Sequence, residues 1–420
     1  TAICATSLIA KEISVDISKK RTESVYFNLN TEAEVTVPND NWDISFMNGV
    51  VNAAIRINGG QGVRLWHVTD GSIADYNNPI DTTGKFDIWK EYINDDKTWT
   101  IGAFNLGHDG FAENTGDYGW GQYSQTVVEG TELFVIKLRN GDYKKIAISE
   151  LSTGIYYFIY SDLNNENQKS EEVSKSDTKD KLFSYFDLEE GKSIDREPLM
   201  SDWDLEFSKY VELVTGQGVT QPYPVVGIRA NQNIKIAQLD GVDVNNTPKP
   251  KDEDFSYVIN EIGWDWKEYD FNTNAYKVVP ERVYYVQRYE IVKKDTGLVE
   301  LPVGALNKIV FTGFDGSKFT FELNGAVASV SEKNDNNKFA VTPNIVNRNE
   351  NLNLIYAGSD LGEATLNIYS ATGQNVYTQS VNLTKNLQIS NINASDLSSG
   401  IYFIRIQKNN SIYTQKFIVK

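Results

Sequence analysis

The sequence is poor in the residues on which small secreted folds and metal sites often depend. It has a single cysteine, Cys4, which excludes an internal disulfide framework and a zinc site built from several thiolates. It has two histidines, His67 and His108, and two methionines, Met47 and Met200. No stretch approaches the roughly 18 apolar residues of a membrane-spanning helix. We therefore expect any membrane association to come through partners or an anchor.

Positive charge is also scarce. The 40 lysines and arginines against 57 acidic residues give a net charge of −17 and a pI near 4.7. Such a field repels phosphate backbones, so nucleic acid is not an expected partner. The sequence has no Gly-x-Ser-x-Gly elbow, phosphate-binding loop or zinc motif. We therefore predict a protein that is not an enzyme, with no metal site and no certain cofactor.

The pattern that is present is that of β-strands. Segments such as 131–138 and 282–288 are rich in β-branched and aromatic residues and are bounded by Gly, Asn and Asp. Helical periodicity is scarce, and 420 residues with 40% hydrophobic content can form two or three ordinary domains. The predicted class is mainly β. The first ten residues are interpreted as a leader remnant or an N-terminal arm, with lipidation of Cys4 as an alternative.

An internal duplication organises most of the chain. The sequence Tyr-Phe-Asn-Leu at 26–29 precedes Trp42-Asp43, and Tyr-Phe-Asp-Leu at 185–188 precedes Trp203-Asp204, with the tryptophans 161 residues apart (203 − 42). A period of this length predicts two copies of one domain, each with its own core. The predicted division is 1–10 arm, 11–162 first copy, 163–181 linker, 182–330 second copy, 331–340 linker and 341–420 C-terminal domain.

The C-terminal domain carries several separate motifs. Val-Thr-Pro-Asn opens it at 341–344, a strand followed by Thr-Gly lies at 366–376, and Leu-Ser-Ser-Gly-Ile-Tyr-Phe-Ile-Arg-Ile spans 397–406. Alternating apolar and polar residues predict a small β-sandwich. The segment resembles the type A C-terminal sorting domain of proteins exported by the type IX secretion system of Bacteroidota. A generic immunoglobulin-like module is the alternative.

That resemblance implies an immunoglobulin-like sandwich that directs Sec-exported cargo across the outer membrane. The implied partners are the type IX translocon and an outer-membrane shuttle protein, and the implied location is the cell surface or the medium. Its recognition surface is expected in the terminal strands, which offer an edge for strand addition and a basic end. The residues expected there are Tyr402, Phe403, Ile404, Lys416, Phe417, Ile418, Val419 and Lys420.

A second resemblance covers about residues 1–330. The order of motifs at 13–16, 42–46, 56–62 and 134–146 is similar to the HmuY-like family of β-rich surface proteins, whose founding members hold haem between two axial histidines. The second copy keeps Trp-Asp and the Thr-Gly-Gln-Gly of 215–218 but lacks the Asn-Gly-Gly core. The resemblance implies two tandem HmuY-like domains that bind haem or another small ligand.

Both histidines lie in the first copy, so a bis-histidine haem site is possible only there, and a histidine paired with Met47 or Met200 is a variant of it. Ordinary loop imidazoles are the alternative. The aromatic residues Tyr118, Trp120 and Tyr123, separated by glycines, could stack on a porphyrin or a sugar, as could Trp264 and Trp266 in the second copy. Core packing is the alternative for them. The candidate ligand-binding set is His67, His108, Trp66, Tyr118 and Trp120.

The first copy is also longer near these aromatics, with 30 residues between 101 and 131 against 19 between 262 and 281. Longer loops often carry binding specificity. Asp43 and Asp204 are interpreted as equivalent structural residues and not as one acid–base pair. The predicted function is an exported surface or secreted binding protein. The alternatives are a surface adhesin, with a role in gliding motility, and a secreted glycan hydrolase.

Overall fold

The computed structural model describes most of the chain from residue 11 onward. The described residues are 11–49, 52–106, 116–216, 218–294, 297–325, 338–342, 345–348, 351–357, 362–370, 374–383, 387–393, 395, 397–408 and 411–420. The chain divides into two compact units, Thr1–Ala326 and Val327–Lys420. The described ranges contain β-sheets and short 3-10 turns, so the predicted mainly β class is confirmed. No helix in those ranges has the length and apolar character needed to cross a membrane.

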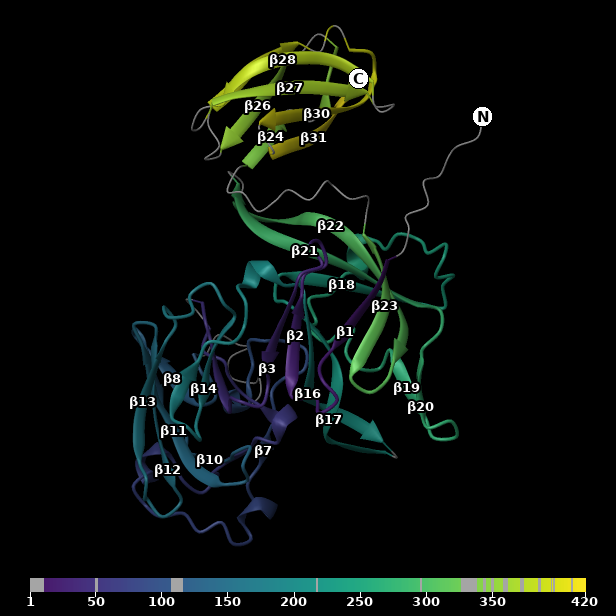
Figure 1. Cartoon of the computed structure of the whole chain (residues 1–420). Helices are drawn as coiled ribbons and strands as arrows, with labels where there is room; N and C mark the ends of the chain where they lie inside the picture. The colour runs from purple at the N-terminus through teal and green to yellow at the C-terminus, as the bar shows by residue number, and fades with distance from the viewer. Residues whose placement is uncertain are drawn as a thin grey trace. The chain divides into compact units, whose positions relative to one another are not determined.

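One continuous stretch of chain forms the first lobe of the larger unit (Figure 1). Its larger sheet has the order β13-β12-β11-β10-β6-β7, with β8 and β9 attached to β11, and its smaller sheet has the order β15-β14-β4-β5. Its strands are β4 Ile44–Met47, β5 Ile55–Ile57, β6 Arg64–His67, β7 Glu91–Tyr92, β8 Gly121–Ser124, β9 Val127–Gly130, β10 Phe134–Lys137, β11 Tyr143–Ser152, β12 Ile155–Asp162, β13 Lys169–Ser174, β14 Phe183–Asp187 and β15 Lys192–Ile194. The 3-10 turns η1 Gly59–Gln61, η2 Ile73–Asp75, η3 Lys85–Asp87 and η4 Ala103–Asn105 lie between them.

Two separate stretches of chain form the second lobe. Its sheets have the orders β1-β23-β22-β21-β18 and β17-β16-β2-β3, and β19 pairs with β20. Its strands are β1 Lys11–Asp16, β2 Glu23–Phe27, β3 Glu34–Pro38, β16 Leu205–Gly216, β17 Val219–Ala230, β18 Ile234–Asp240, β19 Lys267–Asp270, β20 Ala275–Val278, β21 Arg282–Lys294, β22 Gly297–Phe314 and β23 Lys318–Gly325. The turns η6 Met200–Asp202 and η7 Asp252–Asp254 precede β16 and β19.

The two sheet orders show that the repeats exchange strands. β13, β14 and β15 of the second repeat complete the first lobe, at the positions that β1, β2 and β3 of the first repeat occupy in the second lobe. In Figure 1 the purple β1 accordingly lies beside β23, and β2 lies beside β16. The sequence predicted that residues 11–162 and 182–330 form separate copies. In the structure each core instead contains the first three strands of the other repeat.

The predicted linker at 163–181 contains one of these exchanged strands. β13 pairs antiparallel with β12 along its whole length. Because β13 is an edge strand that buries only Val173, its remaining residues are polar, which explains why the segment resembled a solvated linker.

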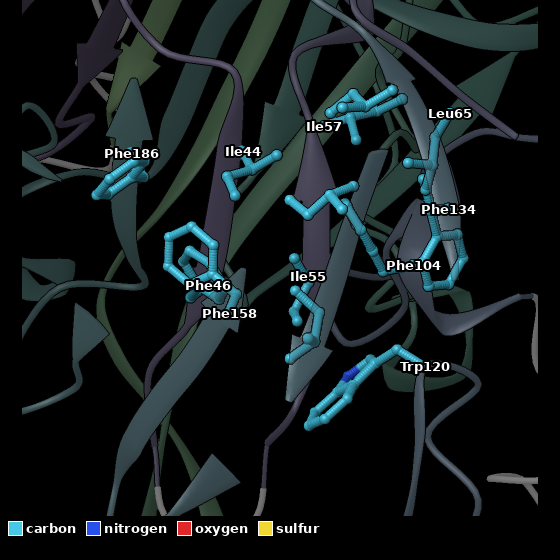
Figure 2. Close-up of a cluster of buried hydrophobic side chains, with 14 of the residues drawn as sticks. Ile44, Phe46, Ile55, Ile57, Leu65, Phe104, Trp120, Phe134, Phe158 and Phe186 are labelled. Atoms are coloured by element: carbon cyan, nitrogen blue, oxygen red, sulfur yellow. The ribbon is translucent and has the colours of Figure 1, made fainter. Parts of the chain in front are cut away.

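The core of the first lobe shows the exchange at the level of side chains. In Figure 2 Phe186 of β14 lies beside Ile44 and near Phe158, which belong to the other repeat. The rings of Phe158 and Phe186 are 5.1 Å apart and nearly perpendicular. Both aromatic residues are almost fully buried. The first core therefore depends on apolar area that the second repeat contributes.

Asp43 and Asp204 hold the exchanged strands in register. The backbone N–H of Leu188 donates to Asp43 Oδ2 at 2.8 Å, and that of Leu29 donates to Asp204 Oδ2 at 2.7 Å. Each aspartate is buried and accepts this bond from the repeat to which it does not belong. The prediction that the two carboxylates are equivalent structural residues is confirmed.

Each aspartate also has an arginine partner. Arg139 Nε donates to Asp43 at 2.9 Å, and Arg288 Nε donates to Asp204 at 2.9 Å. Asn58 and Asn231 occupy matching positions, because the side chain of each donates to the backbone carbonyl of the repeated tryptophan. The sequence analysis found Thr-Gly-Gln-Gly at 215–218 but no Asn-Gly-Gly core in the second copy. Thr215 and Gly216 lie at the end of β16, where it pairs with the start of β17, and Asn231 is the residue equivalent to Asn58.

A second set of buried residues joins the two lobes. The ring of Trp42 packs edge-on against Tyr185 at 4.9 Å, and Tyr26 packs edge-on against Trp203 at 5.0 Å. Each pair unites the two repeats. The repeated tryptophans therefore form the contact surface between the lobes, and each makes the same contact with the other repeat.

Arg196 and Glu197 follow β15 and are buried in this junction. The guanidinium of Arg196 lies over Tyr185, 4.8 Å from the ring centroid, and donates to the carbonyl of Pro38 at 3.1 Å. The carboxylate of Glu197 accepts from the backbone N–H of Phe183 and from the Tyr185 hydroxyl, both at 2.7 Å. Burial raises the pKa of Glu197 to about 7 despite these bonds and the nearby Arg196.

The second unit is a small β-sandwich, as the sequence predicted. Its sheets have the orders β24-β26-β29 and β25-β31-β30-β27-β28. The strands are β24 Lys338–Thr342, β25 Ile345–Val346, β26 Asn351–Ala357, β27 Gly362–Ser370, β28 Asn375–Leu383, β29 Leu387–Asn393, β30 Gly400–Lys408 and β31 Ser411–Val419. Alternate residues of β27, β30 and β31 form its core.

The strand exchange changes which fragment can fold alone. Residues 40–198 contain all twelve strands of the first lobe, whereas residues 11–162 lack β13–β15 and expose their own β1–β3. We predict cooperative thermal unfolding and dispersed amide NMR signals for 40–198 only. Cooperative unfolding of 11–162, with an unfolded 40–198, would contradict the exchange.

The raised pKa of Glu197 predicts a pH effect on stability. Because folding raises this pKa from 4.5 to about 7, the stabilising contribution is complete below pH 4.5 and is lost as pH rises through 7. The free energy of unfolding of the wild type, minus that of Glu197→Gln, should therefore fall by roughly 3 kcal/mol between pH 4.5 and 7.5. Urea unfolding at several pH values measures this difference. A difference independent of pH would show that Glu197 keeps its ordinary pKa.

Candidate functional site

A groove in the described part of the first lobe has a volume of about 1020 Å³. It lies where β8, β9, the β11–β12 turn and the end of β13 meet the segment before β5. We call it the first-lobe groove, and its described lining is Gly49, Asn52, Ala53, Gly116, Tyr118, Tyr123, Thr126, Val128, Leu151, Thr153, Gly154, Ile155, Ser174, Lys175, Ser176 and Lys179. Aromatic, apolar and neutral polar groups predominate. The groove thus has the mixed surface of a small-ligand site.

A buried anchor positions Tyr118 at this groove. Trp120 is fully buried, points into the core in Figure 2, and donates through Nε1 to the carbonyl of Ala53 at 2.9 Å. Asn105 Nδ2 donates to the Tyr118 carbonyl at 2.8 Å. Gly119 between them has φ 81°, and a Cβ there would lie 2.0 Å from the Asn105 carbonyl oxygen. Only glycine can therefore occupy this turn.

Lys175 closes one side of the groove. Its Nζ donates to the carbonyls of Gly49 and Asn52 at 2.7 and 2.5 Å and lies 5.3 Å from the Tyr156 ring centroid. Burial lowers the pKa of Lys175 to about 8. Lys179 lies nearby and is exposed.

The charge of the groove differs from that of the whole protein. Among the described residues that line it there are two lysines and no aspartate or glutamate, although the chain has a net charge of −17. The local field therefore favours a neutral or anionic ligand over a cation.

The histidines do not form a pair that the structure describes. His67 Nε2 lies 2.5 Å from Glu132 Oε2, and its ring lies 5.7 Å from that of Phe134. His67 does not line the first-lobe groove, and His108 lies outside the described residues. Met47 is buried at the lobe junction, and Met200 packs against that same cluster.

The predicted aromatic residues separate into different environments. Trp66 is buried in a cluster on the other side of the larger sheet, where its ring lies 4.5 Å from that of Phe86. Trp120 belongs to the core, and Tyr118 is half-buried at the groove. Of the described members of the proposed ligand-binding set, His67, Trp66, Tyr118 and Trp120, Tyr118 alone lines this groove. In the described ranges no three His, Cys, Asp or Glu side chains gather as a metal site would require.

Reasoning from the sequence missed the lysines of the groove. Lys175 and Lys179 lie in the polar segment that resembled a linker, and no motif marks them. The position of Lys175 next to the exchanged strand β13 becomes visible only with the strand pairing.

The residues predicted for translocon recognition lie on both faces of a sheet. Four of them belong to the core of the C-terminal unit, namely Tyr402, Ile404, Phe417 and Val419. Phe403, Lys416 and Lys420 are exposed, and Ile418 is half-buried. β30 lies between β31 and β27, so Tyr402, Phe403 and Ile404 do not form a sheet edge, contrary to the prediction. β31 is next to β25, which pairs with it at Ile345 and Val346.

Phe403 and Lys416 face each other across β30 and β31, on the side of the sheet away from the core. Phe403 is also the cross-strand partner of Tyr369 on β27, and Arg405 lies 5.8 Å from the Tyr369 ring centroid. This exposed face therefore combines aromatic and cationic side chains.

Comparison with known proteins identifies the C-terminal unit. Residues 341–420 match the family described as the secretion system C-terminal sorting domain. The protein is therefore cargo of the type IX secretion system and is secreted or displayed at the cell surface. The match does not extend to the larger unit, and the HmuY-like resemblance of that unit stays a prediction.

Other comparisons add little. A search of curated proteins finds no match. One solved structure comes from work described as structural insight into host cell surface retention of a 1.5-MDa bacterial ice-binding adhesin. It is 11% identical, the alignment covers 70% of this chain and 89% of that one, and the TM-score is 0.13. A likeness this weak carries no argument about fold or function.

Proposed function

We propose that this protein is an exported binding protein whose first lobe holds a small ligand in the first-lobe groove. The observation that carries the proposal is the lining of that groove, where Tyr118 and Tyr123 adjoin two lysines in a protein of strongly negative charge. Tyr123 is half exposed and presents its ring to an incoming molecule. The ligand class that fits is a ring compound with an acidic group.

Two chemically different ligands meet this description. A porphyrin has a planar ring and two carboxylates, and an acidic oligosaccharide has pyranose rings and uronic acid groups. The HmuY-like resemblance favours the porphyrin. Either ligand could stack on a tyrosine and be attracted to a lysine. Both interactions support binding and require no catalytic group.

Substitution of Tyr123 tests the groove. Tyr123→Ala removes an exposed ring and should weaken binding of haemin or of an oligoglucuronate at least tenfold, because the stacking contact is lost. The matched control is Tyr223→Ala on β17, where the tyrosine has almost the same exposure, 54% against 50%, but does not line the groove. Titration calorimetry with each probe measures both variants.

His67→Ala separates this site from the histidine hypothesis. Because His67 does not line the groove, haemin affinity and the Soret spectrum should stay unchanged in that variant. A lost or shifted Soret band would instead show that His67, on β6, contacts the haem. Equal weakening by Tyr123→Ala and Tyr223→Ala, or no binding of either probe, would reject the groove.

Export depends, in this proposal, on the exposed face of the sorting domain. Negative charge placed there, by Phe403→Asp combined with Lys416→Glu, should retain the protein in the periplasm while its core residues Phe417 and Val419 stay buried. Val376→Asp is the control, since Val376 on β28 has 40% exposure against 39% for Phe403. Cell fractionation decides, with circular dichroism to verify the fold. Normal arrival of the double variant at the surface or in the medium would reject this face.

A further inference from the structure

Arg56 and Arg229 occupy equivalent positions in the two repeats. Each is the second residue of an Ile-Arg-x-Asn sequence, at 55–58 and 228–231. Arg56 on β5 is the cross-strand partner of Ser45 on β4, and Arg229 on β17 is the cross-strand partner of Glu206 on β16. The repeats therefore differ in one decisive residue, because a serine stands where the other copy has a carboxylate.

The equivalence of the two lobes brings these arginines close together. The guanidinium of Arg56 lies 5.0 Å from the centroid of Trp99, and that of Arg229 lies 4.6 Å from the same ring. Arg56 is 4% exposed. Burial, and then the charge of Arg229, lower the pKa of Arg56 to about 9. Two like charges in a buried place need a counter-charge.

The second repeat places a carboxylate in direct contact with its arginine, whereas Asp95 and Glu206 act on Arg56 only from a greater distance. Arg229 Nη2 donates to Glu206 Oε2 at 2.8 Å. Arg56 donates to backbone carbonyls only, those of Thr98, Ile101 and Asp95, at 2.8 to 3.0 Å. No carboxylate of the described chain lies within ion-pair distance of Arg56.

A cavity of about 40 Å³ lies at this place. Ser45, Arg56, Arg196 and Arg229 line it, so three guanidiniums surround a space large enough for two or three waters or one small ion. Arg229 Nε is buried and has no hydrogen-bond partner among the described residues. An unused donor of this kind is costly unless a bound group accepts from it.

Other charged residues also line the cavity. Asp95 uses its Oδ1 to accept from the backbone N–H groups of Lys97 and Thr98, which form a turn of their own. Asp96 and Lys209 are half-buried and carry opposite charges. With Glu206, which also lines the cavity, the lining has three carboxylates against three arginines and Lys209, so one positive charge is left in excess.

We propose that this cavity binds a small inorganic anion of halide size, held over Ser45 in the place that the Glu206 carboxylate takes in the second repeat. The anion accepts from the guanidiniums and so links the two lobes at their junction. Guanidinium donors are suited to such a buried anion because they are always charged and weakly hydrated. The site is distinct from the first-lobe groove and does not depend on it.

Thermal unfolding of the full chain tests the proposal with bromide as the probe. An anion that binds only the folded state raises the melting temperature in proportion to the logarithm of its concentration above Kd. Sodium bromide should therefore raise the melting temperature over sodium gluconate at equal ionic strength, since gluconate is too large for the cavity. Equal melting temperatures in the two salts would overturn the proposal.

Ser45→Glu provides the sharper variant. It places a carboxylate opposite Arg56, as Glu206 is placed opposite Arg229, and should abolish the difference between bromide and gluconate. Ser149→Glu, on an exposed position of β11, adds the same charge elsewhere and should keep the difference. A Ser45→Glu protein that still responds to bromide as the wild type does would reject the site.

A crystallographic measurement keeps the test decisive if Ser45→Glu does not fold. Wild-type crystals soaked in sodium bromide should give an anomalous difference peak between Arg56 and Arg229. A peak at other surface positions, with none in this cavity, would overturn the proposal. A peak in the cavity without any shift of the melting temperature would mean an adventitious ion only, and would also overturn it.

Discussion

Two buried ion pairs, Asp43 with Arg139 and Asp204 with Arg288, maintain the arrangement on which the larger unit depends. Each aspartate also accepts a hydrogen bond from a backbone N–H of the other repeat. One carboxylate therefore both pairs with an arginine and anchors the exchanged segment. Removing Asp204 would leave the largely buried guanidinium of Arg288 without a carboxylate and the Leu29 N–H unpaired, and breaking a buried pair in this way costs about 3–5 kcal/mol. Arg139 would keep Asp187 as a partner on loss of Asp43, so that loss should cost less. Within each lobe the two repeats are therefore held together by buried polar groups, in addition to their apolar contacts.

The sequence predicted the parts of this fold that local pattern controls. The repeated Trp-Asp pairs revealed the duplication, alternation identified strands, and the C-terminal motifs predicted a sorting domain that the family match confirms. The strand exchange was not predictable, because alternation specifies which face of a strand is buried but not which strand lies beside it. β13 shows the limit most clearly, since an edge strand with one buried valine has the composition of a loop.

The site was predictable to a smaller extent. Tyr118 lies at the groove, whereas Trp66 and Trp120 are buried in hydrophobic clusters. The larger indole rings favour burial because they remove more apolar area from water than a tyrosine does. Lys175 had no local signal. Arg56 and Arg229 did have one, the repeated Ile-Arg-x-Asn, which could have shown that two like charges occupy equivalent places. What could not be predicted from the sequence is that the equivalence brings both guanidiniums to the ring of one tryptophan, Trp99, at 5.0 and 4.6 Å from its centroid.

The two proposed sites both arise where the repeats stop being equivalent. At the junction, strand exchange brings equivalent residues together, and because Ser45 stands where the second repeat has Glu206, Arg56 has no carboxylate opposite it. At the groove, the first repeat has a longer segment between residues 101 and 131, and the aromatic side chains of that segment stand on a core that the second repeat helps to build. A rigid frame of shared strands thus allows one copy to vary at its surface without loss of its core. It is in such variable segments on a fixed frame that a binding protein can acquire a ligand.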